Sequence, residues 1–178
     1  MLQFAALALL VLFTATSPVS AESDASTVSM TNERIGAILE RLELETVGDD
    51  GQWRIILDGR SVMIITDAAH DRMRIMTHVT AAEALEPEHL TRVMQANFDS
   101  ALDARYALAR NTLWSVFIHP LASLSDHDFI TGLGQVVNLA NNFSSSFSSG
   151  LLMFGGGDSG QIRERELIEG LLEKGLSI

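Results

Sequence analysis

The sequence predicts an α+β domain in which an antiparallel sheet of about five strands carries helices on one face. Three observations predict it: short runs of alternating polarity follow one another, helical patterns lie before, between and after those runs, and the connections are short. Parallel strands need a long crossover, so short connections imply antiparallel pairing. Helices separated from antiparallel strands form a layer on one sheet face. The expected order is α-β-β-β-α-β-β-α, followed by a C-terminal helix.

The first half of the domain is expected to hold one helix and three strands. An apolar stripe at helical spacing predicts a helix from Thr31 or Asn32 to about Glu45. Residues 22–30 before it are polar and small and read as a flexible N-terminus, while residues 48–51 (GDDG) read as a turn. The runs that alternate in polarity predict three strands: Gln52–Asp58, Ser61–Asp67 and Arg72–Thr80.

The second half contains a central helix, a hairpin and another helix. Pro87 suits the first turn of the central helix, and Asn97 or Asp99 can end it. A helix is then expected from Ser125, with Asp128 three residues on as in a capping box. The two strands of the hairpin are expected at Ala104–Ala109 and Thr112–His119.

Residues 144–160 are rich in Ser and Gly and are expected to form a linker to an amphipathic helix over residues 161–178. An isolated helix of about 15 residues is marginal in water, so its apolar stripe should pack on something. We expect this C-terminal helix to cover the face of the sheet that the other helices leave uncovered. Gly132 and Gly134 weaken the helix before the linker by about 1 kcal/mol each relative to Ala, unless close packing requires them.

Residues 1–21 have the pattern of a signal peptide. Residues 4–13 form an apolar run, and residues 17–21 (SPVSA) end in small side chains spaced as at an A-x-A cleavage site. The run is short for a membrane span, which needs about 20 residues. Cleavage after Ala21 predicts a periplasmic or secreted protein, with a retained anchor as the alternative.

The composition excludes several classes of function. The net charge is −11, and residues 1–21 contain no charged side chain, so the mature chain is acidic. Nucleic acid and anionic membranes bind clustered Lys and Arg, which disfavours both as partners. The absence of cysteine excludes disulfides, thiolate catalysis and metal sites with cysteine ligands.

Residues 31–143 resemble a known family. The stretches that carry the resemblance are LTRVMQANF, RYALARNTLWSVFIHPLASL and DFITGLGQVVNLANNF, with Asn97, Leu113-Trp114 and Pro120-Leu121 as its markers. They are similar to the YbjN-like family, a relative of the CesT-like type III secretion chaperones. The resemblance implies a compact domain, usually a homodimer, that binds protein segments and has no catalytic residues. Those chaperones act in the cytoplasm, whereas this chain has a signal peptide.

Two clusters of acids and histidines offer an enzymatic alternative. One cluster lies in a turn and the other at the start of a helix. Either could form the metal site or acid–base site of a small hydrolase. Acids at a helix N-terminus have a sufficient structural role, and no two histidines are spaced at i, i+4. We therefore predict no catalytic residue, no metal and no cofactor. The alternative residues are Asp67, His70 and Asp71, or Asp126, His127 and Asp128.

The second face of the predicted sheet carries more apolar side chains than a solvated face should. If one set of alternating residues faces the helices, then Ile56, Met63, Ile65 and Met76 face the other way. Either the C-terminal helix or a dimer mate covers them, or they form a binding surface where methionine adapts to varied partners. The leading interpretation is an exported, non-enzymatic protein that binds polypeptide segments, either chaperone-like or regulatory, and forms a homodimer.

Overall fold

A computed structural model describes residues 29–99, 101–148 and 158–177 and confirms the α+β class. Among these residues a single antiparallel sheet has six strands in the order β1-β2-β3-β4-β6-β5. Its strands are β1 (Thr46–Asp49), β2 (Gln52–Leu57), β3 (Arg60–Asp67), β4 (Arg72–Ala81), β5 (Arg105–Ala109) and β6 (Thr112–His119). The helices are α1 (Asn32–Arg41), α2 (Pro87–Asp99), α3 (Asp126–Ser148) and α4 (Asp158–Leu176), with short 3₁₀ turns at Ala68–His70 and Ala82–Ala84.

The first helix ends before the predicted Glu45, and an unpredicted strand, β1, runs into the residues where the sequence predicts a turn, 48–51. Helix α1 ends at Arg41, and Glu43 follows with a positive φ of 56°, which breaks the helix. The next residues pair with β2 across a turn in which Asp50 and Gly51 also have positive φ. All four residues of β1 are exposed, so this strand has no alternating polarity that the sequence could reveal.

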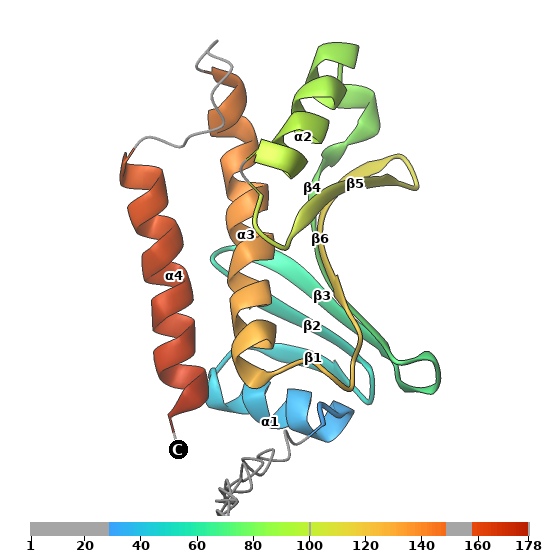
Figure 1. The fold of residues 1–178 in the computed structure, drawn as a ribbon, viewed down its shortest axis with the longest axis vertical. Coiled ribbons are helices and arrows are strands. Elements are labelled where there is room, and N and C mark those ends of the chain that lie inside the picture. The colour runs from blue at the N-terminus through green and yellow to red at the C-terminus, as the bar shows by residue number, and fades with distance from the viewer. Residues whose placement is uncertain (1–28, 100, 149–157, 178) are drawn as a thin grey trace, which may run out of the picture.

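The helices lie on one side of the sheet, and α3 is placed between the sheet and α4 (Figure 1). Helix α3 is therefore buried on two sides, and its two glycines explain how. A Cβ at Gly132 would lie 3.0 Å from the Phe117 ring on β6, and a Cβ at Gly134 would lie 2.5 Å from Cγ1 of Ile168 on α4. The missing side chains allow close packing on both sides, which offsets their cost to the helix.

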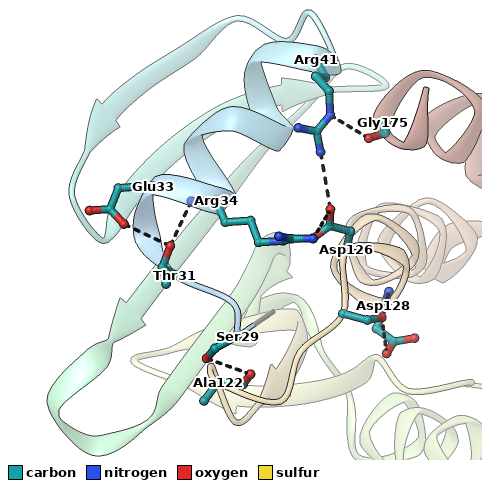
Figure 2. Close-up of polar contacts among 10 residues, drawn as sticks. Ser29, Thr31, Glu33, Arg34, Arg41, Ala122, Asp126, Asp128 and Gly175 are labelled. Atoms are coloured by element: carbon teal, nitrogen blue, oxygen red, sulfur yellow. Dashed lines mark hydrogen bonds and ion pairs between the residues drawn. The ribbon is translucent and has the colours of Figure 1, made fainter. Parts of the chain in front are cut away.

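The prediction that the C-terminal helix covers the open sheet face is wrong. Helix α4 packs against α3 and α1 instead, where Leu171 is buried in the main core and Leu167 and Leu172 pack against it. Its end is held by Arg41, whose Nε donates to the Gly175 carbonyl oxygen at 2.9 Å (Figure 2). Contacts of α3 explain this position, because Ile130 and Gly134 of α3 lie beside Gly175 and Ile168 of α4.

The domain boundaries differ in part from the predicted ones. Helix α3 continues to Ser148 and α4 begins at Asp158, so both ends of the predicted linker are helical. Residues 149–157, the predicted signal peptide and most of the predicted flexible N-terminus lie outside the described residues. Within the described part of the chain, no helix combines the length and the apolar character needed to cross a membrane.

Candidate interaction surface

The register of the sheet brings the four predicted surface residues together on the face without helices. Ile56 lies on β2, Met63 and Ile65 on β3, and Met76 on β4, where Met63 and Met76 are direct cross-strand partners. Their sequence neighbours on the other face, such as Ile64 and Ile75, are fully buried. Ile56 is 48% exposed, and the other three surface residues are half-buried.

Strand β6 adds three apolar side chains that the sequence analysis missed. Val116 is the cross-strand partner of Met76, while Trp114 and Ile118 lie two residues to either side of it. Ile118 is 57% exposed and Trp114 is half-buried. Alternation along Thr112–His119 was the available signal, because Leu113, Ser115 and Phe117 face the core. We call the apolar surface of β2, β3, β4 and β6 the open face.

Two arginines stand within the open face. Arg54 on β2 pairs across the strands with Val47 and Met63, and Arg74 on β4 pairs with Ile65 and Ile118. Both side chains are exposed, and neither makes an ion pair or a hydrogen bond with any described residue. Their aliphatic stems lie among apolar neighbours while the charged ends remain available.

The first candidate acid–base cluster performs a structural role in the β3–β4 turn. The Oδ2 atom of Asp67 lies 2.8 Å from Nδ1 of His70, and its Oδ1 accepts a hydrogen bond from the His70 backbone. The hydrogen bond from the His70 side chain lowers the pKa of Asp67. The Asp71 carboxylate accepts from the backbone N–H of Ala122 at 2.6 Å. Both acids therefore fix backbone around the turn.

The second cluster anchors the start of α3. Asp126 forms a two-point pair with Arg34, at 2.5 and 3.0 Å, and also lies 3.6 Å from Nη2 of Arg41 (Figure 2). Hydrogen bonding to the Asp126 carboxylate raises the pKa of Arg34. Ser125 caps the helix as predicted, because the Asp128 N–H donates to its hydroxyl oxygen. The Asp128 carboxylate accepts from that hydroxyl, whereas the predicted capping box would have it accept from the Ser125 backbone N–H.

His127 is exposed, and its Nδ1 atom lies 3.4 Å from the Asp128 carboxylate. The pKa of Asp128 is lowered chiefly by the hydrogen bond from Ser125. The acids in both clusters thus form capping hydrogen bonds and ion pairs. Their carboxylates do not point into a common site. Among the described residues, no three acids, histidines or cysteines form a group that could hold a metal ion.

A cleft of about 370 Å³ lies between β6 and α3, and its polar groups also hold the chain in place. Gln135 lines this cleft, and its Oε1 accepts from the backbone N–H groups of Asp103 and Ala104 at 2.9 and 3.0 Å. Its Nε2 donates to the Asp103 carboxylate. These bonds fix the connection from α2 to β5 against α3, a role that the sequence analysis did not assign to Gln135.

A second exposed apolar surface lies on α2. The inner side of this helix packs into a smaller core through Val93 and Ala96, which are 3% and 1% exposed. Its outer side carries Leu90, Met94 and Phe98 at i, i+4 and i+8, and Phe98 is 90% exposed. The apolar residues of α2 are therefore divided between a buried row and an exposed row.

The markers of the family resemblance have structural roles at the edge of the sheet. The Asn97 side chain accepts from the Tyr106 N–H at 2.7 Å and donates to the Tyr106 carbonyl oxygen at 3.1 Å. It thus occupies a backbone donor and acceptor of β5, an edge strand whose free groups are a liability. Leu113 and Leu121 are buried in the cores. The Trp114 indole N–H donates to the Ala109 carbonyl oxygen.

Comparisons with known proteins find similarity in fold only. No family model matches the sequence, and no curated protein is significantly similar to it. A chain of the ExsC–ExsE complex is similar with a TM-score of 0.54 and 14% identity, over 67% of this chain and 95% of that one. A chain of the HopA1–SchA chaperone–effector complex has a TM-score of 0.49 and 14% identity, over 61% and 88%. The ExsC–ExsE match shows that this chain shares its fold with that chain over 67% of its own length.

Proposed function

We propose that this protein is an exported, non-enzymatic, chaperone-like or regulatory module that binds segments of another protein, and that its residues 31–143 belong with the YbjN-like proteins. The open face carries this proposal. Its apolar side chains lie on four neighbouring strands, and no described helix covers them. Ile56 and Ile118 are exposed, Val116 is buried, and the others are half-buried. Exposed apolar patches on soluble domains are typical of interaction sites.

The contact residues in this proposal are Ile56, Met63, Ile65 and Met76. Two of the four are methionines that lie next to each other across β3 and β4. Methionine has a flexible, polarizable side chain and adapts to partners of different shape. The fold similarity to a chain of the ExsC–ExsE complex supports a protein partner over a small-molecule substrate.

The test is capture of a partner by crosslinking from the envelope fraction of the source cell, followed by mass spectrometry. Wild-type protein is compared with Met63→Asp/Met76→Asp and with a control, His127→Asp, which changes an exposed residue at the start of α3. We expect the partner to be enriched with wild type and control and lost with the double variant. Equal recovery with all three proteins would remove the open face from the proposal.

The enzymatic alternative is tested separately. A hydrolase screen and metal analysis of wild type, His70→Ala and His127→Ala should find no turnover and no bound metal in any of them. Turnover that either substitution abolishes would replace the binding proposal with an enzyme.

The outer side of α2 supports a homodimer. Leu90, Met94 and Phe98 form an exposed row on one helix, and Leu108 on the edge strand β5 is 55% exposed. Two copies that pair through this row would bury side chains that a monomer exposes to water. Light scattering should give twice the mature mass for wild type and the mature mass for Met94→Glu/Phe98→Glu. A monomeric wild type at micromolar concentration would contradict the dimer.

Export rests on the pattern of residues 1–21. Mass spectrometry of protein recovered from the native envelope should show a chain that begins at Glu22. A chain that keeps residues 1–21 and remains with the membrane would favour the retained anchor.

A further inference from the structure

The apolar side chains of the open face form a diagonal band that crosses four strands. The band consists of Ile56 on β2, Met63 on β3, Met76 on β4 and Ile118 on β6. Adjacent strands are about 4.8 Å apart and residues rise about 3.3 Å along a strand, so the band is about 20 Å long. An occupant of this band lies across the strands, whereas an added strand would pair with a sheet edge.

The charge of the open face is opposite to that of the whole protein. The chain has a net charge of −11, with 12 Lys and Arg residues against 23 Asp and Glu residues. Arg54 and Arg74 nevertheless stand along one side of the band without an ion pair to any described residue. The carboxylates on this face, Asp49 and Asp67, lie at the ends of β1 and β3. The middle of the face is therefore apolar and cationic.

From this geometry we infer that the open face binds an acidic amphipathic helix of the partner protein. The inference rests on the proposed protein-binding function and specifies its ligand. Apolar residues on one side of the ligand helix would pack on the diagonal band, and Asp or Glu residues beside them would pair with Arg54 and Arg74. A helix rises 1.5 Å per residue, so a band of about 20 Å accommodates about 13 residues.

A helix accounts for both features of the face better than the other occupants do. An added strand would pair its backbone at β1 or β5 and leave the central methionines uncovered. An anionic membrane would also attract the arginines, but the overall negative charge of the protein opposes its approach to such a surface. A peptide segment contacts the face locally and avoids most of that repulsion.

Binding is measured by fluorescence anisotropy with labelled helical peptides of about 15 residues. One peptide carries Leu on one side with Glu along the flank of that side, and a matched peptide carries Lys at the Glu positions. The proteins are wild type, Arg54→Glu/Arg74→Glu, and the control Arg110→Glu. Arg110 lies in the β5–β6 turn and is exposed, away from the diagonal band. Thermal melts first establish that all three are folded.

We expect wild type and the control to bind the Glu peptide at least about tenfold more tightly than the Lys peptide, with affinity that falls as salt rises. The double variant should lose at least about tenfold in affinity for the Glu peptide and should prefer the Lys peptide. Equal binding of the two peptides by wild type, or unchanged affinity in the double variant, would overturn the inference.

Vesicles that contain phosphatidylglycerol provide a second arm. If wild type binds these vesicles but not the Glu peptide, the face recognises a membrane and the inference is wrong. The crosslinking experiment above separates this inference from the proposed function. A partner captured equally by wild type and by Arg54→Glu/Arg74→Glu would retain a protein-binding role and reject the acidic helix as its ligand.

Discussion

The two faces of the sheet are built from the same strands, yet they meet different surroundings. On the helix side, alternate residues such as Ile55 and Ile64 are fully buried beneath α1, α3 and α4. On the open side, their neighbours Ile56 and Met63 are apolar too, but no described helix lies over them. Apolar character alone therefore does not decide which face becomes the core.

The two faces differ in what covers them and in the charged groups that they carry. Two layers of helix cover the helix side, because α3 packs on the sheet and α4 packs on α3. Ion pairs at Asp126 hold the start of α3, and a hydrogen bond to the Gly175 carbonyl oxygen holds the end of α4. The open side instead mixes half-buried methionines with Arg54 and Arg74, which form no ion pair with a described residue. A core requires side chains that fit one fixed set of neighbours, whereas a binding surface keeps its charged groups available. The following predictions test this contrast.

Removal of α4 should have the largest effect. A chain that ends at Ser148 leaves the outer side of α3 uncovered, including the neighbours of Leu171. Burial of one leucine side chain is worth about 1.5–3 kcal/mol, and Leu167 and Leu172 add to it, so we expect the free energy of unfolding to fall by about 4 kcal/mol or more. Urea denaturation measures the change. A truncated chain as stable as the full one would mean that α4 is an accessory to the core.

Adjacent residues on β3 allow a direct comparison of the two faces. Ile64→Ala removes a fully buried side chain and should cost about 2–5 kcal/mol of unfolding free energy, because a cavity remains. Met63→Ala, one residue away on the open face, should cost less than about 1 kcal/mol. Chemical denaturation of both variants gives the ratio. Similar costs would show that the open face is covered in solution, by a second copy or by another part of the chain.

Loss of the Asn97 side chain should have an intermediate effect at the sheet edge. Asn97→Ala leaves the Tyr106 N–H and carbonyl oxygen without their side-chain partner and should destabilise by about 1–3 kcal/mol. Asn97→Asp is the matched control, because it retains the acceptor for the N–H but loses the donor to the carbonyl. Amide exchange at Tyr106 should be faster in Asn97→Ala than in Asn97→Asp. Equal protection in wild type and both variants would contradict the edge role.

The smallest effect is expected at the capping box of α3. Ser125→Ala should cost about 1 kcal/mol at neutral pH. The pKa of Asp128 in the folded protein lies below its ordinary value, so its contribution is present above about pH 4 and is lost as the pH falls through the folded pKa. The difference between wild type and Ser125→Ala should therefore shrink in acid, by a few tenths of a kcal/mol because Asp128 is 55% exposed. A difference that is constant from pH 7 to pH 2 would show that the ionised carboxylate contributes nothing.

The sequence by itself determined the α+β class, most of the strands and the antiparallel pairing. These features depend on local signals: alternation along Arg72–Thr80, a tight turn at Asp58-Gly59, and short connections that permit no parallel crossover. It also placed four residues of the open face correctly on one side of the sheet, because the period of a strand fixes which side chains share a face. The use of that surface stays a prediction.

Only the tertiary structure decided what each surface packs against. Strand β1 forms because β2 offers an edge, and its own exposed residues carry no periodic signal. The position of α4 depends on contact between Gly134 and Ile168, which lie 34 residues apart in the sequence, and on a third apolar layer outside α3. Asn97 looked like a helix end, but its side chain pairs with a strand that follows it. Periodicity states which side of an element is apolar, whereas the partner of that side is set by packing among segments distant in the chain.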